Sequence, residues 1–267
     1  MDEAVLYAID GEGIVTLTLN RPDMRNPISD PEMVEALLGA LVRLETDPAA
    51  RVAILTGAGQ GFSSGGNIRE MAPGGNLNTG SPAATRLAYK RGIQRLPLAF
   101  AALEVPVIAA VNGAAIGAGC DLACMCDLRI AGESAKFAES FVKLGLIAGD
   151  GGSWLLPRVV GWSKAAEMAL TGDPIDAAEA LACGLVGEVV ADGDLLASAN
   201  ELARRIASNP PHAVRMTKRL LWEGRRADLG TLLDMASAMQ AAAHATADHE
   251  EAVAAFLAKR KPIFKGS

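Results

Sequence analysis

Residues 105–121 constrain the fold of this chain more than any other stretch, because they place a buried strand directly before a glycine-rich turn and a helix. Residues 105–111 form an apolar run rich in valine, which is typical of a strand covered on both faces. Glycines follow at positions 113, 117 and 119, and a helical pattern begins at about Ala118. The first N–H groups and the positive dipole end of that helix face the turn. We therefore expect this turn to be able to hold a developing oxyanion.

Asp121 is the only carboxylate in the first turn of the predicted helix. One interpretation is an ordinary helix aspartate, because acidic residues at this end stabilise a helix by about 0.3–1 kcal/mol. The other interpretation is a proton-transfer group beside the oxyanion. Its position in the sequence leaves both open.

The composition disfavours two broad classes of function. Of the 267 residues, 50% are hydrophobic, which is enough for one large core with or without an appendage. The formal net charge is −6 and only 4% of the residues are aromatic, so we expect no nucleic-acid partner. The longest nearly apolar run, residues 96–120, contains two prolines, a glutamate and three glycines, so we expect no membrane partner.

The four cysteines stand at positions 120, 124, 126 and 183. They form no Cys-x-x-Cys pair and no cluster with histidine, so no metal site is predicted. Buried free thiols of a reducing compartment account for them better. The acidic residues 1–4 do not resemble a signal peptide, and we expect a cytoplasmic protein.

Strands and helices alternate over the first two thirds of the chain, and helices alone follow. Ser29 or Asp30 is expected to cap the first helix, with Pro31 at its first position. A longer helical stretch, residues 82–103, is expected to break near Pro97. Strands are predicted at residues 5–9, 14–19, 51–56, 105–111, 127–131 and 185–190, and the closing helices at 194–208, 210–224, 228–246 and 248–258. This order predicts an α/β core of residues 1–192 with a helical C-terminal subdomain, residues 193–267.

The glycine-rich loop of residues 57–67 follows a strand, which invites a dinucleotide or phosphate interpretation. The third glycine of Gly-x-Gly-x-x-Gly would fall on Phe62, and in the second glycine cluster it would fall on Leu122. No Gly-Lys-Ser/Thr follows either cluster, so we reject that interpretation. Gly65-Gly66 instead leaves backbone N–H groups open to close approach by a ligand.

Several separated motifs agree with one family. Residues 62–67 resemble the Phe-x-x-Gly-x-Asp motif of the enoyl-CoA hydratase/isomerase (crotonase) superfamily, and residues 112–121 resemble its Asn-Gly-x-x-x-Gly-Gly-Gly-x-Glu motif. The Thr171-Gly172 pair, residues 178–186 and the ending at 264–266 continue the likeness, which covers about residues 5–266. The resemblance implies a ClpP/crotonase spiral of ββα units. It also implies that residues 193–267 build homotrimers, often paired into hexamers.

This resemblance implies an acyl-CoA thioester substrate, with coenzyme A as part of the substrate and no other cofactor. Its members hold the thioester oxygen with two backbone N–H groups, which match Gly66 and Ala118 here. Both segments could also be mere tight turns. The implied reaction is hydration of a 2-enoyl-CoA through a thioester enolate, as in fatty acid metabolism.

The hydratases of the family use two glutamates, and this chain departs from both. The first position falls on Asp121 and the second on Phe141, which cannot accept a proton. Glu139 lies two residues earlier and would need a local shift. Asp150, in a third glycine-rich turn, is the stronger substitute, although it could equally cap the next helix. We expect burial among Phe141, Leu144 and Ile147 to raise the pKa of one carboxyl.

The acyl-CoA contacts follow from the resemblance alone. The matched positions are Met24 and Arg25 beside the adenosine and pantetheine, Ser64, Asn67 and Ile68 along the thioester arm, Phe141 and Leu144 at the acyl group, and Lys265, or Lys259 with Arg260, at a phosphate. Phe141 occupies the position of the second glutamate and cannot transfer a proton. An isomerase, a carbon–carbon hydrolase and a catalytically silent acyl-CoA-binding protein therefore remain alternatives. A serine hydrolase is not predicted, because no Gly-x-Ser-x-Gly occurs and all three histidines fall in the helical tail.

Overall fold

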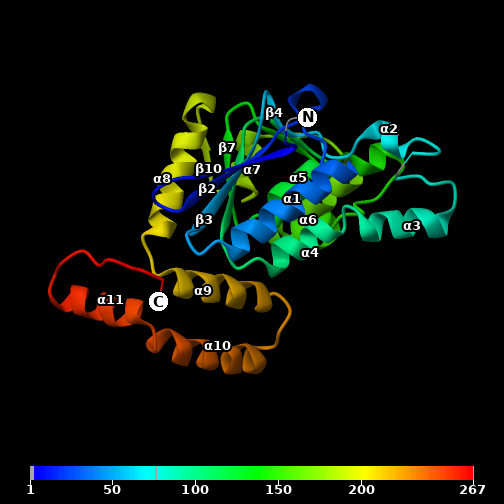
Figure 1. Cartoon of the computed structure of the whole chain (residues 1–267). Helices are drawn as coiled ribbons and strands as arrows, with labels where there is room; N and C mark the ends of the chain where they lie inside the picture. The colour runs from blue at the N-terminus through cyan, green and yellow to red at the C-terminus, as the bar shows by residue number, and fades with distance from the viewer. Residues whose placement is uncertain (1–2, 76, 267) are drawn as a thin grey trace.

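The computed structural model describes residues 3–75 and 77–266. Its described part contains two sheets, with helices on both faces of the larger one (Figure 1). The six-stranded sheet has the order β1 (Val5–Ile9), β2 (Ile14–Leu19), β3 (Val52–Gly57), β5 (Val107–Val111), β7 (Leu128–Gly132) and β10 (Glu188–Val190). The four-stranded sheet has the order β4 (Gly61–Ser63), β6 (Ala114–Ile116), β8 (Lys136–Ala138) and β9 (Ile175–Asp176).

The central strands are buried along their whole length and are apolar except for Thr56, because both of their faces are covered. All six residues of β3 and all five of β5 are buried. Alternate side chains enter two cores: Val52 and Ile54 pack toward α8 (Leu195–Ala207), whereas Ala53 joins the core on the other face. The predicted α/β arrangement follows from this two-sided burial.

The remaining helices cover the second face or form the C-terminal part. On the core side they are α1 (Pro31–Thr46), α2 (Ile68–Met71), α3 (Pro82–Arg91), α4 (Arg95–Ala102), α5 (Ala118–Met125), α6 (Gly152–Thr171) and α7 (Ala177–Ala182), with short 3₁₀ turns η1 (Pro22–Met24), η2 (Ser140–Leu144) and η3 (Asp192–Asp194). The C-terminal helices α9 (Pro211–Glu223), α10 (Leu229–His244) and α11 (Ala247–Leu257) extend away from the sheets (Figure 1). The expected boundary at residues 192/193 precedes α8, which itself covers the large sheet.

One local prediction was confirmed in position, and two were wrong. Asp30 is the N-cap of α1 but makes no side-chain cap bond; its carboxylate accepts from the Asn67 side chain, and Ser29 Oγ accepts from the Asn67 N–H. The long helical stretch breaks at Gly92, the C-cap of α3, because Pro97 lies in the first turn of α4, where no N–H is needed. The four-stranded sheet was missed because its strands have only two or three residues each.

The C-terminal segment folds back onto the rest of the chain. The Asp248 carboxylate accepts hydrogen bonds from the N–H groups of Lys265 (2.7 Å) and Gly266 (2.8 Å). Arg51 Nη2 donates to the Phe264 carbonyl at 3.1 Å.

Among the described helices, none is long and apolar enough to cross a membrane.

Candidate active site

Two glycine-rich turns meet at one edge of the four-stranded sheet. β4 and β6 are parallel neighbours, so their carboxyl ends lie side by side. Gly65 has a φ of +80°, and a Cβ placed on it would stand 2.1 Å from the Ile116 carbonyl oxygen and 2.9 Å from the Ala118 nitrogen. A Cβ on Gly119 would be 2.4 Å from the Ser63 carbonyl oxygen. The glycines therefore allow the turn after β4 to press against the start of α5.

This contact leaves two backbone N–H groups free beside each other. The amides on either side of Gly66 are both used, because Gly65 donates to Ser63 Oγ (3.0 Å) and Asn67 donates to Ser29 Oγ (2.8 Å). Within the described chain the Gly66 N–H itself has no acceptor. Ala118 is the first residue of α5, so its N–H has no partner in the helix. Two fixed donors next to a helix N-terminus can stabilise a negative oxygen.

Three buried carboxyl groups lie together, one of them in the first turn of α5. Asp121 is 0% exposed, and Glu139 and Asp150 are each 2% exposed. The Asp121 carboxyl is within hydrogen-bonding reach of both others. No group in residues 3–75 and 77–266 donates a hydrogen bond to either oxygen of Asp121, to either oxygen of Asp150 or to Glu139 Oε1. We refer to these three residues as the carboxyl cluster.

Burial raises the pKa values of the carboxyl cluster, and no Lys or Arg ion pair of the described residues offsets this effect. Burial and the neighbouring charges of Asp150 and Glu139 raise the pKa of Asp121 well above its ordinary value. Burial also raises the pKa of Asp150, and it raises the pKa of Glu139 to about 7. The ion pairs formed by the described residues include none of the three. Ionised carboxylates only accept hydrogen bonds, so neighbouring members must share protons to pair.

The N-terminus of α6 closes the carboxyl cluster on one side. A Cβ on Gly152 would lie 2.1 Å from Asp121 Oδ1. The N-cap of α6 is Gly151, with a φ of 114°, and no side chain caps this helix. The capping interpretation of Asp150 is therefore wrong, and its carboxyl is left without a structural partner. Its role in proton transfer stays a prediction.

The residues expected to bury the carboxyls do not do so. Leu144 is 51% exposed and Ile147 is 80% exposed. Phe141 is half-buried, and its ring lies 3.6 Å from the position of a Cβ on Gly117, at the turn that opens α5. The pKa shift has the expected direction, but it arises from the packing around α5 and the start of α6.

The sequence analysis ranked Glu139 below Asp150 as the second acid. The pairing of the four-stranded sheet explains where Glu139 lies. β6 and β8 are parallel with Ile116 opposite Ala138, and the Gly117 N–H donates to the Ala138 carbonyl at 2.7 Å. The residue after β8 therefore lies at the same edge as the turn before α5. The signal available in the sequence was a glutamate directly after the short apolar pair Phe137-Ala138.

A groove leads to this edge from the side of η1. It encloses about 470 Å³ and is lined by the predicted contacts Arg25 and Ser64, together with Asp23, Gln60 and Ile116 among others. Arg25 has a φ of 62°, and Ser64 donates its N–H to the Arg25 carbonyl at 2.8 Å. The groove therefore brings two of the predicted contacts together.

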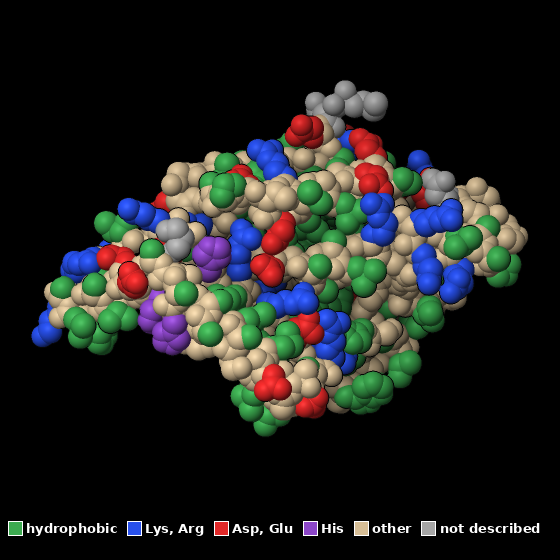
Figure 2. All heavy atoms as spheres, turned by 60° about the horizontal axis from the view of Figure 1, so that its bottom comes forward, with side chains coloured by type: hydrophobic (Ala, Val, Ile, Leu, Met, Phe, Trp, Pro, Cys, Tyr) green, Lys and Arg blue, Asp and Glu red, His purple; other side chains and the backbone are tan. Residues whose placement is uncertain are grey.

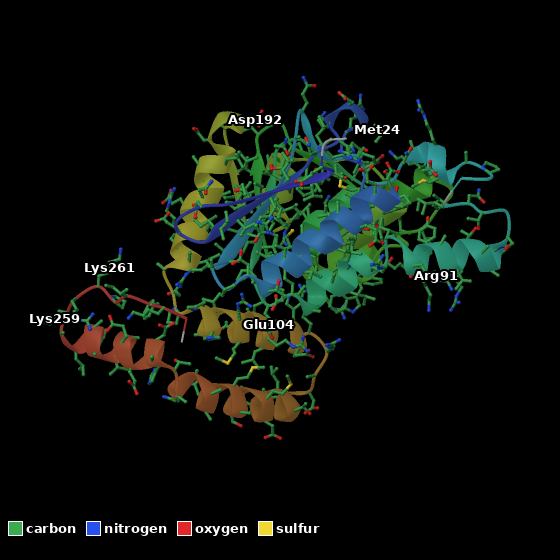
Figure 3. The ribbon with its side chains drawn as sticks, viewed as in Figure 1. Met24, Arg91, Glu104, Asp192, Lys259 and Lys261 are labelled. Carbon is green, nitrogen blue, oxygen red and sulfur yellow. The ribbon has the colours of Figure 1, made fainter. Side chains whose placement is uncertain are left out.

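The other predicted contacts lie around this groove or away from it. Met24, on η1, and Ile68, at the start of α2, are 50% and 65% exposed. Asn67 caps α2 by accepting from the Arg69 N–H. Figure 3 shows Met24 at the edge of the core and Lys259 at the far end of the helical extension, so Lys259 does not reach the groove of its own chain. Arg260 is paired with Glu251 at 2.6 Å.

The structure offers neither a metal centre nor a histidine at this site. Among the described residues, no three His, Cys, Asp or Glu side chains are arranged to hold a metal ion. All four cysteines are free thiols. The histidines lie on the C-terminal helices (Figure 2), where His244 Nδ1 is 3.0 Å from His249 Nε2. The titratable side chains described above at the glycine-rich edge are the three carboxyls.

The fold and these paired donors define an enzyme of the crotonase class, and the comparisons with known proteins agree. The model of the enoyl-CoA hydratase/isomerase family matches residues 10–267, so the chain belongs to this family. It is 40% identical over the full length of both chains to the 1,2-epoxyphenylacetyl-CoA isomerase of Escherichia coli K12. It is 37% identical to the short-chain-enoyl-CoA hydratase of Clostridium acetobutylicum, covering 95% of each chain.

Solved structures confirm the predicted fold class. The enoyl-CoA hydratase of Bacillus anthracis superposes with a TM-score of 0.91 at 35% identity, covering 99% of this chain and 100% of the other. The α/β crotonase fold with C-terminal helices expected from the motifs is thus the fold of this chain.

Proposed function

We propose that this enzyme hydrates the double bond of a 2-enoyl-CoA. The observation that carries the proposal is the unpartnered carboxyl cluster, whose Asp121 lies in the first turn of the helix that begins at Ala118. The gap that Phe141 leaves at the second glutamate position is offset by Asp150, which is buried within hydrogen-bonding reach of Asp121. Two carboxyls are thus present to exchange protons with water and substrate.

In the proposed reaction, the oxygen of water bonds to C3 and its proton passes to the ionised member of the Asp121–Asp150 pair. The electrons of the double bond move onto the thioester oxygen, which the Gly66 and Ala118 N–H groups hold. The protonated member then gives its proton to C2, and the thioester carbonyl re-forms. Raised pKa values suit this exchange, because one carboxyl must carry a proton near neutral pH. Coenzyme A enters as part of the substrate, and we propose no other cofactor.

A second candidate, double-bond isomerisation through the same enolate, is favoured by Phe141. Its ring covers Gly117 at the turn that opens α5, where a glutamate would otherwise meet the water. An isomerase needs only one carboxyl to take a proton from one carbon and return it to another. The Escherichia coli relative is also named an isomerase, although its printed substrate is 1,2-epoxyphenylacetyl-CoA.

Two absorbance assays separate these reactions. Hydration removes the conjugated enoyl-thioester absorbance of crotonyl-CoA and of a longer or branched 2-enoyl-CoA, whereas isomerisation of a 3-enoyl-CoA creates it. We expect Asp121→Asn and Asp150→Asn each to slow hydration by about 10²–10⁴-fold while thioester binding is kept. Asp234→Asn, an exposed aspartate on α10, is the control.

The outcomes decide between the alternatives. Hydration that persists in both variants would remove the two-carboxyl mechanism. No turnover of 2-enoyl-CoA with turnover of the 3-enoyl isomer would establish the isomerase. Tight binding without either reaction would leave a carbon–carbon hydrolase or a silent acyl-CoA-binding protein.

We further propose a cytoplasmic enzyme of fatty acid metabolism that assembles as a homotrimer or hexamer. The free thiols support a reducing compartment. The helical extension supports assembly, because it exposes large apolar side chains such as Leu229 (72%) and Phe256 (83%). Sedimentation of the purified protein tests the oligomer.

A further inference from the structure

The mechanism above uses Asp121 and Asp150 but leaves a third buried carboxyl without a role. Glu139 is as buried as Asp150, and its Oε1 has no donor among the described residues. An unpaired buried carboxyl is costly, and a glutamine of the same shape would avoid that cost. No structural partner in the described chain accounts for its charge, so we looked for a role in the reaction.

Glu139 lies next to Asp121. It follows β8 at the edge beside Gly117, and its carboxyl is within hydrogen-bonding reach of the Asp121 carboxyl and of the Cys120 thiol. On the α6 side it faces Asp150, which in turn lies near Tyr89 of α3. Each of these facing groups is neutral or acidic, so within residues 3–75 and 77–266 a proton is the only positive charge available to the cluster.

We propose that Glu139 is a positioning residue that shares one proton with Asp121 and so keeps Asp121 protonated when the enoyl thioester binds. This role rests on the proposed function. When Asp121 gives the shared proton to C2, the Asp121 and Glu139 carboxyls are both left ionised. The proton that water released to Asp150 then passes to Asp121 and restores the shared proton. The balance of protons over one turnover is zero.

The pH profile of Glu139→Gln tests this role. The amide keeps the shape and can still donate a hydrogen bond, but it removes the charge that raises the pKa of Asp121. Asp121 then loses its proton at lower pH, so the alkaline limb of kcat/KM should move about one pH unit to the acid side. At pH 8 the variant should therefore lose about tenfold more activity than at pH 6, relative to the wild type.

Matched variants separate positioning from a merely structural role. Glu139→Asp retains an ionisable group and should move the limb back toward the wild-type position. Glu133→Gln, an exposed glutamate between β7 and β8, should leave the profile unchanged. A uniform loss of activity at all pH values in Glu139→Gln, with the limb in place, would overturn the proposal.

Infrared difference spectroscopy of the wild-type protein supplies a readout that needs no turnover and no variant. A protonated-carboxyl band should disappear between pH 6 and pH 8, and Glu139→Gln should remove or displace that change. Absence of any such band in the wild type would overturn the shared proton even if Glu139→Gln failed to fold. If the wild type turns over no enoyl-CoA, the proposed function fails, while the infrared result still decides the protonation of Glu139.

Discussion

Gly65 lies against Ala118 without room for a side chain between them. A Cβ on Gly65 would stand 2.9 Å from the Ala118 nitrogen and 2.1 Å from the Ile116 carbonyl oxygen. The two proposed oxyanion donors therefore keep their spacing only while residue 65 is a glycine. Backbone atoms form the contact, so the neighbours cannot move aside as a flexible side chain would.

Gly65→Ala should separate these donors. We expect kcat/KM to fall by at least about 100-fold, the loss typical of one oxyanion donor. Stability should also fall by about 1–2 kcal/mol or more, because φ is +80° at this position. Gly61→Ala is the control, since its Cβ would meet nothing closer than 3.7 Å. Enoyl-CoA kinetics and urea unfolding measure both effects, and wild-type kinetics in Gly65→Ala would contradict the assignment of the donors.

Gly152→Ala should displace the Asp121 carboxyl, because the new Cβ would stand 2.1 Å from its Oδ1. Asp121 must then turn away from the acyl site or push α6 outward. We expect at least a tenfold loss of kcat with a smaller change in thioester binding. Gly193→Ala has open space around the added Cβ and should behave as the wild type. Equal losses in the two variants would show that the effect is general rather than local.

Asp150→Asn should reduce activity without the stability loss of a missing helix cap. The N-cap of α6 is Gly151, so the usual penalty of about 1 kcal/mol for losing a cap does not apply. Thermal unfolding at pH 8 should give a melting temperature equal to or above that of the wild type. A lower melting temperature would indicate a structural bond to the Asp150 carboxylate. Asp228→Asn, at the N-cap of α10, is a useful comparison, because that carboxylate does accept from Thr231.

Glu139→Gln should stabilise the protein at alkaline pH. The folded state holds the pKa of Glu139 at about 7, above the ordinary value of 4.5, so the folded chain binds this proton more tightly than the unfolded chain. The wild type therefore loses stability as the pH rises from about 4.5 to about 7. The variant avoids this loss, which amounts to about 3 kcal/mol at pH 8. Denaturant unfolding at pH 5 and pH 8 measures it, and a difference that does not grow with pH would contradict the raised pKa.

The strand, turn and helix of residues 105–121 could be predicted because burial, glycine and helical periodicity change there within a few residues. The sheet order could be expected only as a class, since pairing is decided by distant strands. β4, β6 and β8 have three residues each, too few for a periodic signal, so no strands are predicted there. The break at Gly92 was assigned to Pro97 because the sequence does not show that a helix restarts at Arg95.

The site was predicted as far as local motifs reach. The motif glycine Gly65 packs against Ala118, and Asp121 lies one turn further along α5, whereas the roles of Gly66, Ala118 and Asp121 stay predictions. Counting residues from Phe137 placed the second acid at Phe141, but η2 begins at Ser140 and turns the chain, which leaves Glu139 inward. This turn depends on the packing of η2 against α6, and no local sequence pattern predicts it.

The parallel pairing of β6 and β8 has a consequence for how such enzymes can diverge. Gly117 and Glu139 follow neighbouring strands, so any short segment after β8 emerges over the same turn. An acid can therefore appear, move by two positions or be lost from residues 139–141 while the proposed backbone oxyanion donors keep their positions. In this fold the proposed oxyanion donors and any acidic side chain at residues 139–141 come from different segments of the chain. New reactions can therefore arise by substituting that acidic side chain while the donor segments stay unchanged.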